Sequence, residues 1–111
     1  MSRFEEAVKD VDLLLDLVGG ETLARSWQVL SPKGRIVTTA APEIAAQLSE
    51  GRRGGWFRMR SDGAQLAEIA GKVAAGELTV VIDQVVTTEQ AGDAIECNKQ
   101  GHGAGKTVVR L

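Results

Sequence analysis

The chain has 111 residues, enough for one ordinary domain, and its 43% apolar and 25% charged residues are typical of a soluble globular protein. Its 13 basic and 15 acidic side chains are mixed along the chain and give a net charge of −2, so no basic stripe indicates nucleic-acid binding. No apolar run approaches the roughly 20 residues of a membrane-spanning helix, and the first residues lack the apolar centre of a signal peptide.

The first part of the chain predicts a strand, a helix and a second strand. Residues 12–20 form a near-continuous apolar run stopped by two glycines, which is typical of a strand covered on both faces of a parallel sheet. Leu23, Trp27 and Leu30 then follow at the spacing of one helical face. Residues 35–40 are β-branched and apolar and predict the second strand. The three elements predict parallel strands joined by a right-handed crossover.

Shorter elements are expected next. Residues 42–55 begin with a proline suited to a first helical turn and pass into a loop rich in glycine and arginine. Residues 56–60 predict a short strand that contains Trp56 and Phe57.

The clearest helical pattern covers residues 61–78. Asp62 and Gln65 have the spacing of a capping box, and Gly76 suits the carboxyl-terminal cap. The apolar stripe of this helix consists of Leu66, Ile69, Ala70 and Val73.

The remaining pattern predicts a strand at 79–86, a helix at 87–100 and a last strand at 106–111. Thr87 and Gln90 have capping-box spacing at the start of that helix. The glycine-rich stretch 101–106 lacks the opening glycine of a phosphate-binding loop, and it lies between a helix and a strand rather than after a strand. We therefore expect it to be a turn.

Few side chains carry obvious chemistry. Cys97 and His102 are too few for a zinc site, which needs three or four converging ligands, and no catalytic residue or metal ligand is predicted. A lone cysteine forms no intrachain disulfide, so Cys97 is expected to be packed and the setting reducing and cytoplasmic. Asp12 and Asp16 flank the first strand; we favour strand-end hydrogen bonds over general acid–base catalysis.

The ends of the two parallel strands are the better candidate site. Ligands of open parallel sheets bind outside the carboxyl ends of the strands. Here those ends are residues 17–20 and 38–42, whose small side chains let a flat ligand approach the backbone. The alternative is that Gly19 and Gly20 only form a tight turn between strand and helix.

Three motifs, in this order, resemble the medium-chain dehydrogenase/reductase superfamily, in particular its quinone oxidoreductase-like and zinc-type alcohol dehydrogenase-like branch. They are an aspartate-containing strand ending in Val-Gly-Gly at 18–20, a Gly-Arg-Ile-Val strand at 34–37, and Gly-His-Gly-Ala-Gly-Lys at 101–106 before a valine-rich strand. The resemblance covers nearly the whole chain. It implies an α/β fold with a partial, mainly parallel Rossmann-type sheet.

The resemblance also implies two regions and a cofactor. Residues 1–60 correspond to the second half of a Rossmann cofactor-binding domain, with 56–60 as its edge strand. Residues 61–111 correspond to a connecting helix and to helix and strand elements that return to the catalytic domain. The implied cofactor is NADP, with NAD possible. The residues implied to bind it are Val18, Gly19, Gly20, Thr39, Ala40, Ala41 and Pro42.

Other parts of the family pattern have no counterpart in this sequence. The phosphate-binding glycine fingerprint, the residues that select NADP over NAD and the substrate domain would all precede residue 1. We therefore expect a fragment of an NAD(P)H-dependent reductase of quinones, enones or carbonyls, inactive alone because hydride transfer needs a closed cleft. Its expected partners are the nicotinamide cofactor and the missing amino-terminal domain.

Two alternatives stay open. In the first, the chain is a non-catalytic assembly module that forms a homodimer through the edge strand at 56–60. In the second, it is a short standalone protein with a flavodoxin-like strand order and a phosphate at Gly19 and Gly20.

Overall fold

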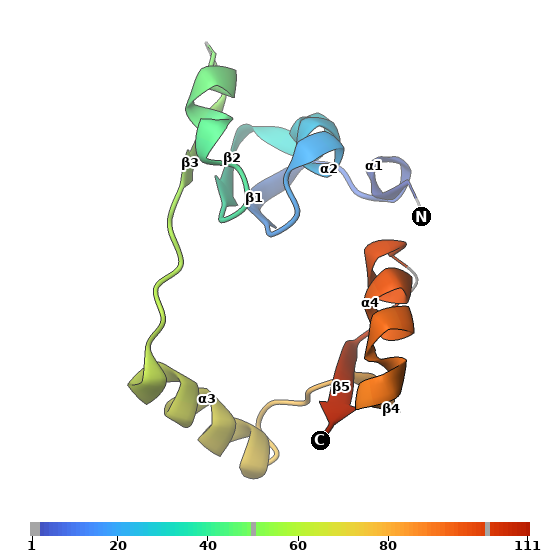
Figure 1. Ribbon diagram of the computed structural model, residues 1–111. Helices are drawn as coiled ribbons and strands as arrows, with labels where there is room; N and C mark the ends of the chain where they lie inside the picture. The colour runs from blue at the N-terminus through green and yellow to red at the C-terminus, as the bar shows by residue number, and fades with distance from the viewer. Residues whose placement is uncertain (1–2, 50, 102) are drawn as a thin grey trace. The chain divides into compact units, whose positions relative to one another are not determined.

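A computed structural model describes residues 3–49, 51–101 and 103–111, and the chain divides into two compact units (Figure 1). Unit 1 is Met1–Arg60 and unit 2 is Ser61–Leu111. Each unit contains its own small parallel sheet, which confirms the α/β class with parallel strands. Within the described ranges, no helix has the length and apolar character to cross a membrane.

Unit 1 is built around three parallel strands in the order β1-β2-β3. Helix α2 and the 3-10 turn η1 connect β1 to β2, the 3-10 helix η2 connects β2 to β3, and a short helix α1 comes first. The bounds are α1 Phe4–Ala7, β1 Val11–Asp16, α2 Gly20–Ser26, η1 Trp27–Val29, β2 Leu30–Thr38, η2 Pro42–Gln47 and β3 Arg53–Trp56.

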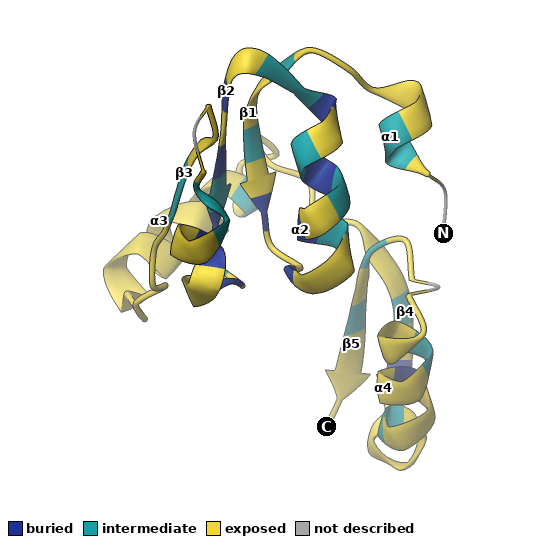
Figure 2. Ribbon diagram, turned by 90° about the horizontal axis from the view of Figure 1, so that it is seen from above, coloured by how far each residue is buried: buried dark blue, intermediate teal, exposed yellow. Residues whose placement is uncertain are grey.

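The core of unit 1 lies on one face of this sheet, beneath α2 and η2 (Figure 2). Its buried members are Leu23, Ile36, Ala41 and Ile44, each at most 1% exposed. Leu13 and Leu15 of β1 point away from this core and are 62% and 58% exposed. The prediction that both faces of the first strand are covered is therefore wrong within unit 1, because the connecting helical segments supply apolar side chains to one face only.

The helical pattern predicted through Leu30 ends earlier in the structure. Leu30 begins β2 and pairs with Val11, whereas the next pairing is Leu13 with Arg35, so the residues between form an irregular step in β2. A Cβ atom on Gly34 would lie 2.5 Å from the Val11 carbonyl oxygen. The backbones approach so closely there that glycine is required, and this tertiary contact outweighs the helical spacing.

The third strand also differs from its prediction. β3 covers Arg53–Trp56 rather than residues 56–60, and the segment predicted as a helix after Pro42 is the short η2. A Cβ atom on Gly54 would lie 2.6 Å from the Ile36 carbonyl oxygen. The glycines that indicated a loop therefore allow β3 to approach β2, and β-propensity alone misplaces the strand on the aromatic residues.

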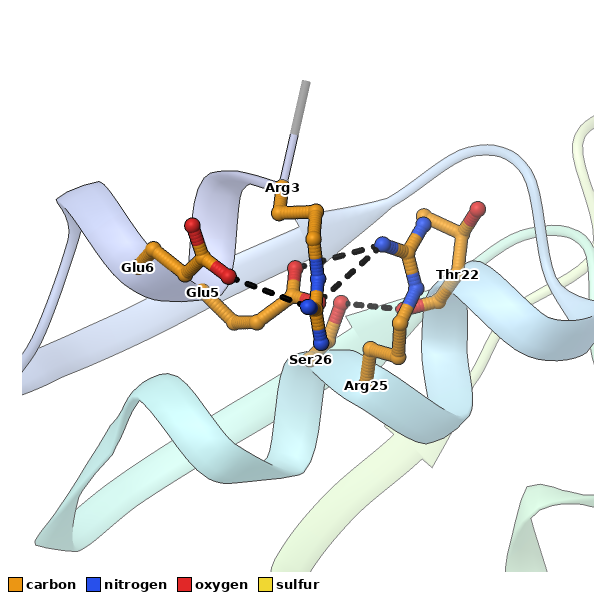
Figure 3. A network of polar contacts seen from close by, with 6 residues as sticks. All are labelled: Arg3, Glu5, Glu6, Thr22, Arg25 and Ser26. Carbon is orange, nitrogen blue, oxygen red and sulfur yellow. Dashed lines mark hydrogen bonds and ion pairs between the residues drawn. The ribbon is translucent and has the colours of Figure 1, made fainter. Parts of the chain in front are cut away.

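Helix α1 was not predicted, and side-chain contacts hold it against α2 (Figure 3). The Arg25 guanidinium donates to both Glu5 carboxylate oxygens at 3.2 Å and lies 5.2 Å from the centre of the Phe4 ring. Arg3 adds ion pairs to Glu5 at 3.4 Å and to Glu6 at 3.1 Å. The long-range pair between Arg25 and Glu5 explains how a helix of four residues persists although isolated helices of that length do not.

Unit 2 pairs β4 with β5 in parallel, connected by η3 and α4. Its bounds are α3 Gly63–Ala74, β4 Ile82–Thr87, η3 Thr88–Gln90, α4 Ala91–Lys99 and β5 Lys106–Arg110. At the start of α3 the Asp62 carboxylate accepts from the Gln65 N–H at 3.0 Å, and the capping box of Thr87 with Gln90 forms in both directions. Gly76 follows α3 with φ of +79°. The three predicted cap positions are confirmed.

The glycine-rich stretch near the end of the chain is a turn, as predicted. Gly101 has φ of +75° after α4, and Lys106 starts β5 with its N–H donated to the Val81 carbonyl at 2.8 Å. His102 lies outside the described residues. The stretch therefore joins a helix to a strand.

Candidate functional site

The carboxyl ends of β1 and β2 lie side by side in unit 1. Asp16 and Thr38, the last residues of the two strands, are register partners, and Thr38 is also the partner of Trp56 at the end of β3. The loops at 17–20 and 39–42 therefore leave the same edge of the sheet. This is the edge at which parallel α/β sheets bind ligands.

Asp16 organises the first loop. Its carboxylate is buried, with the residue 4% exposed, and it accepts hydrogen bonds from the Gly19 N–H at 3.0 and 3.1 Å and from the Val18 N–H at 3.3 Å. A buried carboxylate needs such donors because its desolvation is costly. The favoured interpretation of a strand-end hydrogen bond is thus confirmed for Asp16. Asp12 likewise accepts from the Ser31 hydroxyl at 2.8 Å.

Thr38 connects the first loop to the second. Its fully buried hydroxyl donates to Asp16 Oδ2 at 2.6 Å and accepts from the Ala40 N–H at 3.1 Å. The Thr39 N–H donates to the Asp16 backbone carbonyl at 3.1 Å. We call this arrangement the Asp16–Thr38 pair. It fixes both loops relative to the sheet and to each other.

Two consecutive glycines shape the first loop. Gly19 and Gly20 have φ of +75° and +55°, a region that side chains disfavour. A Cβ atom on Gly19 would lie 3.3 Å from the Ala40 Cβ, so the two loops are in close contact. A Cβ atom on Gly20 would meet nothing within 4 Å, which leaves open space beside the loop.

The seven predicted cofactor-binding residues differ in accessibility. Val18 is 70% exposed, Gly20, Ala40 and Pro42 are exposed, and Thr39 is half-buried. Gly19 is buried between the loops, and the Ala41 side chain belongs to the core. The edge therefore offers a ligand mainly the exposed members of the set.

Trp56 is an unpredicted neighbour of this edge. Its indole N–H donates to the Thr39 carbonyl at 3.4 Å while the side chain remains 42% exposed, and the Phe57 N–H donates to the Thr38 carbonyl at 3.1 Å. The third strand thus borders the second loop. The sequence contained one signal for Thr38, a hydroxyl residue at the end of an apolar strand, but none for the register that brings Trp56 beside it.

The chemistry of the edge favours a flat, weakly charged group over a phosphate. The N–H groups of Val18, Gly19, Thr39 and Ala40 are already donated within the edge, two of them to the Asp16 carboxylate. A phosphate needs free N–H donors and is repelled by a nearby carboxylate. The nearby Asp16 carboxylate therefore argues against the alternative of a phosphate at the two glycines. Small side chains beside the open space at Gly20 instead suit contact with a planar ring.

In the part of the chain that the structure describes, no group of three or more His, Cys, Asp or Glu side chains gathers where it could hold a metal ion. Cys97 is half-buried in α4. The described residues therefore do not fit a zinc site.

A parallel sheet with a glycine turn and a loop of small residues at its carboxyl edge defines part of a Rossmann-like cofactor-binding fold. The sequence pattern of the family described as zinc-binding dehydrogenase matches residues 1–109, and the chain belongs to this family. The prediction of a medium-chain dehydrogenase/reductase is confirmed.

Similar proteins include enzymes of known structure. The chain superposes on the quinone oxidoreductase from Coxiella burnetii with a TM-score of 0.78 and 26% identity, over 99% of this chain and 36% of that one. For the CurK enoyl reductase the TM-score is 0.64 with 26% identity, over 96% and 38%. The zebrafish (Danio rerio) mitochondrial NAD(P)H oxidoreductase RTN4IP1 is 27% identical over 90% of this chain and 32% of its own length. The chain thus spans about a third of the length of these relatives.

Proposed function

We propose that this chain is the part of an NAD(P)H-dependent oxidoreductase that receives the nicotinamide end of the cofactor. The observation that carries the proposal is the edge held by the Asp16–Thr38 pair, where the exposed Val18, Gly20 and Ala40 lie on two loops in contact. The names of similar proteins, an NAD(P)H oxidoreductase and a quinone oxidoreductase, support the same cofactor class. NADP is the preferred form, and the substrate class is a quinone, an enone or a carbonyl.

The residues of this edge act by positioning. Val18 and Ala40 offer apolar contact to a planar ring, and Gly20 leaves room for it. The buried pair beneath them holds the loops without reorganisation when the ring arrives, which lowers the cost of binding. Bound nicotinamide supplies the hydride. Because the chain spans about a third of the relatives' length, we expect weak binding and no turnover from these 111 residues alone.

Titration of the ¹⁵N-labelled chain with NADPH tests the proposal. We expect saturable amide shifts at Val18, Gly20 and Ala40 with a dissociation constant above about 1 μM, which corresponds to about −8 kcal/mol. Val18→Ser is expected to weaken binding roughly two- to fivefold, because a hydroxyl replaces the two methyl groups and apolar contact with the ring is lost. Val8→Ser is the matched control, since Val8 is also exposed in unit 1 but precedes β1.

Two results contradict the proposal. Unchanged amide shifts at both loops up to millimolar NADPH reject the site, and an equal effect of the two valine variants shows that contact at this edge is not the cause. Sub-micromolar affinity, or steady oxidation of NADPH at 340 nm with a quinone, rejects the expectation that the chain alone is insufficient.

A second candidate function is assembly through β3. The strand order leaves β3 with β2 as its partner on one side, and Trp56 and Phe57 at its end are 42% and 50% exposed. Such an edge favours strand addition by a second copy. Sedimentation velocity over a hundredfold range of protein concentration tests this. A dimer whose population does not depend on NADPH supports assembly, and a monomer at every concentration rejects it.

A further inference from the structure

Three arginines line one groove of about 460 Å³ in unit 1. They are Arg35 of β2, Arg53 of β3 and Arg52 just before β3. The rest of the lining is Val37, Leu48, Gly54 and Gly55, so no carboxylate of the described residues contributes to it. We call this feature the arginine groove. Its volume falls within the range of small-molecule sites.

The arrangement of the arginines places like charges together. Arg35 and Arg53 are register partners in the parallel pair of β2 and β3, so they are cross-strand neighbours on one face of the sheet. Like charges in this relation repel each other. Among the ion pairs of the described residues, none involves Arg35, Arg52 or Arg53. The groove therefore concentrates positive charge, and no described residue supplies it with a counterion.

The third arginine is held in position. The Arg52 guanidinium lies 4.9 Å from the centre of the Trp27 ring, a cation–π contact. The Trp27 indole N–H in turn donates to the Gln47 side-chain oxygen at 2.9 Å. This chain of contacts restricts the Arg52 side chain before any ligand arrives, which reduces the entropic cost of binding.

No described atom covers the groove above Gly55. Gly55 pairs with Val37, so it lies on the same face as Arg35 and Arg53, and a Cβ atom there would meet nothing within 4 Å. A compact group can therefore approach the sheet at Gly55, beside Arg35 and Arg53. Planar guanidinium forks match the oxygens of phosphate and form paired, charge-assisted hydrogen bonds with them.

We propose that the arginine groove binds a small molecule through a phosphate group. The groove follows β3 from Arg53 to Gly55, whereas the candidate nicotinamide edge consists of the loops at 17–20 and 39–42, beyond the carboxyl ends of β1 and β2. The two sites are distinct, because no arginine lies on the two loops of the nicotinamide edge, and the N–H groups of Val18, Gly19, Thr39 and Ala40 are already donated there.

Titration of the full chain with inorganic phosphate at constant ionic strength tests this. We expect saturable shifts of the arginine Nε–H signals of Arg35, Arg52 and Arg53 and of the Gly55 amide, while Gly20 and Ala40 do not move. Acetate at the same ionic strength is expected to bind at least tenfold more weakly, because it carries one charge and offers two oxygens.

Two variants change the groove in different ways. Arg53→Gln removes one charged fork and is expected to weaken phosphate binding about tenfold, the loss of one strong charge-assisted contact. Gly55→Val fills the floor, leaves the charge unchanged, and is expected to weaken binding at least as much. Arg58→Gln is the matched control, an exposed arginine outside the groove that is expected to have no effect.

The proposal is overturned by shifts that do not saturate, by acetate binding as well as phosphate, or by Arg58→Gln weakening binding as much as Arg53→Gln. Binding that survives Gly55→Val unchanged overturns it as well. Circular dichroism checks that each variant is folded, and Arg52→Gln replaces Arg53→Gln if that strand variant is not.

Discussion

Both units contain parallel strands joined by helical segments, three strands in unit 1 and two in unit 2, but they differ in burial. In unit 1 the core residues Leu23, Ile36 and Ile44 are at most 1% exposed. In the described part of unit 2, the buried apolar residues are Val86 and Ala94, at 9% and 7% exposed. Unit 1 thus has a core of its own, whereas the described elements of unit 2 bury few apolar side chains.

The difference shows which forces form each unit. The apolar stripe of α3 is exposed, with Leu66 and Ile69 at 66% and 46% (Figure 2). Its ends nevertheless carry the expected caps, at Asp62 and Gly76. Local signals therefore account for the elements of unit 2, whereas tertiary burial contributes most of the stability of unit 1.

The largest expected effect comes from the core of unit 1. Ile36→Ala is expected to lower the free energy of unfolding by about 2–5 kcal/mol, because Ile36 is fully buried and truncation leaves a cavity. Urea unfolding followed by tryptophan fluorescence measures this, since Trp27 and Trp56 both belong to unit 1.

Leu66→Ala on α3 is the matched control, with an expected change within about 0.5 kcal/mol in unfolding followed by circular dichroism. A large loss from Leu66→Ala, or a small one from Ile36→Ala, contradicts the contrast between the units.

A smaller effect is expected from the Asp16–Thr38 pair. Thr38→Val keeps the shape of the side chain but removes its hydrogen bonds to Asp16 and Ala40, at an expected cost of about 1–3 kcal/mol. In unit 2 the half-buried Thr107 hydroxyl accepts from Gln84 at 3.3 Å, and Thr107→Val is expected to cost less than about 0.5 kcal/mol.

The same denaturation measurements separate the two threonines. Amide exchange at Gly19 and Ala40 adds a local readout, because loosening of the loops by Thr38→Val exposes their N–H groups. Equal costs for both variants, or unchanged exchange at both loops, shows that the pair does not hold this edge.

The smallest effects are those of pH. The pKa of Glu5 is lowered first by its own backbone N–H and then by Arg25 and Arg3, and the pKa of Glu89 is lowered first by its own backbone N–H and then by the Thr87 hydroxyl. A carboxyl group with a lowered folded pKa contributes its full stabilisation above the ordinary glutamate value of about 4.3. That contribution is lost as the pH falls through the folded pKa.

Carbon-13 titration of the two carboxyl groups measures these shifts. Arg25→Gln is expected to raise the Glu5 pKa part of the way to the ordinary value and to leave the Glu89 pKa unchanged. The change is only partial because the backbone N–H is the larger cause of the shift. Thr87→Val is expected to return part of the Glu89 pKa shift toward the ordinary value and to leave the Glu5 pKa unchanged. If the titration midpoint of Glu5 does not change in Arg25→Gln, the contact with Arg25 is not a cause of the lowered pKa.

Sequence patterns predicted those elements whose signals are local. The caps of α3 and η3 and the turn before β5 depend on neighbouring residues, and they appear where expected. The position of β3 was missed, because Gly54 is selected by its approach to Ile36 rather than by strand propensity. Helix α1 was missed because its contacts to Arg25 cross about twenty residues of chain.

The sequence predicted the position of the candidate site but not the contacts within it. The rule of carboxyl ends identified the two loops, and the structure places both at one edge. The burial of Ala41 in the core and the bond from Thr38 to Asp16 depend on packing and register, which one sequence without structure does not fix.

The strand order of unit 1 has a consequence for how the chain folds during synthesis. β1, β2 and β3 occupy the sheet in the order in which they leave the ribosome. Each new strand pairs with the strand made just before it, so no strand must wait for a partner made much later, and the loops to be closed stay short. Unit 1 can therefore assemble progressively from its amino-terminal end, as domains generally do during translation.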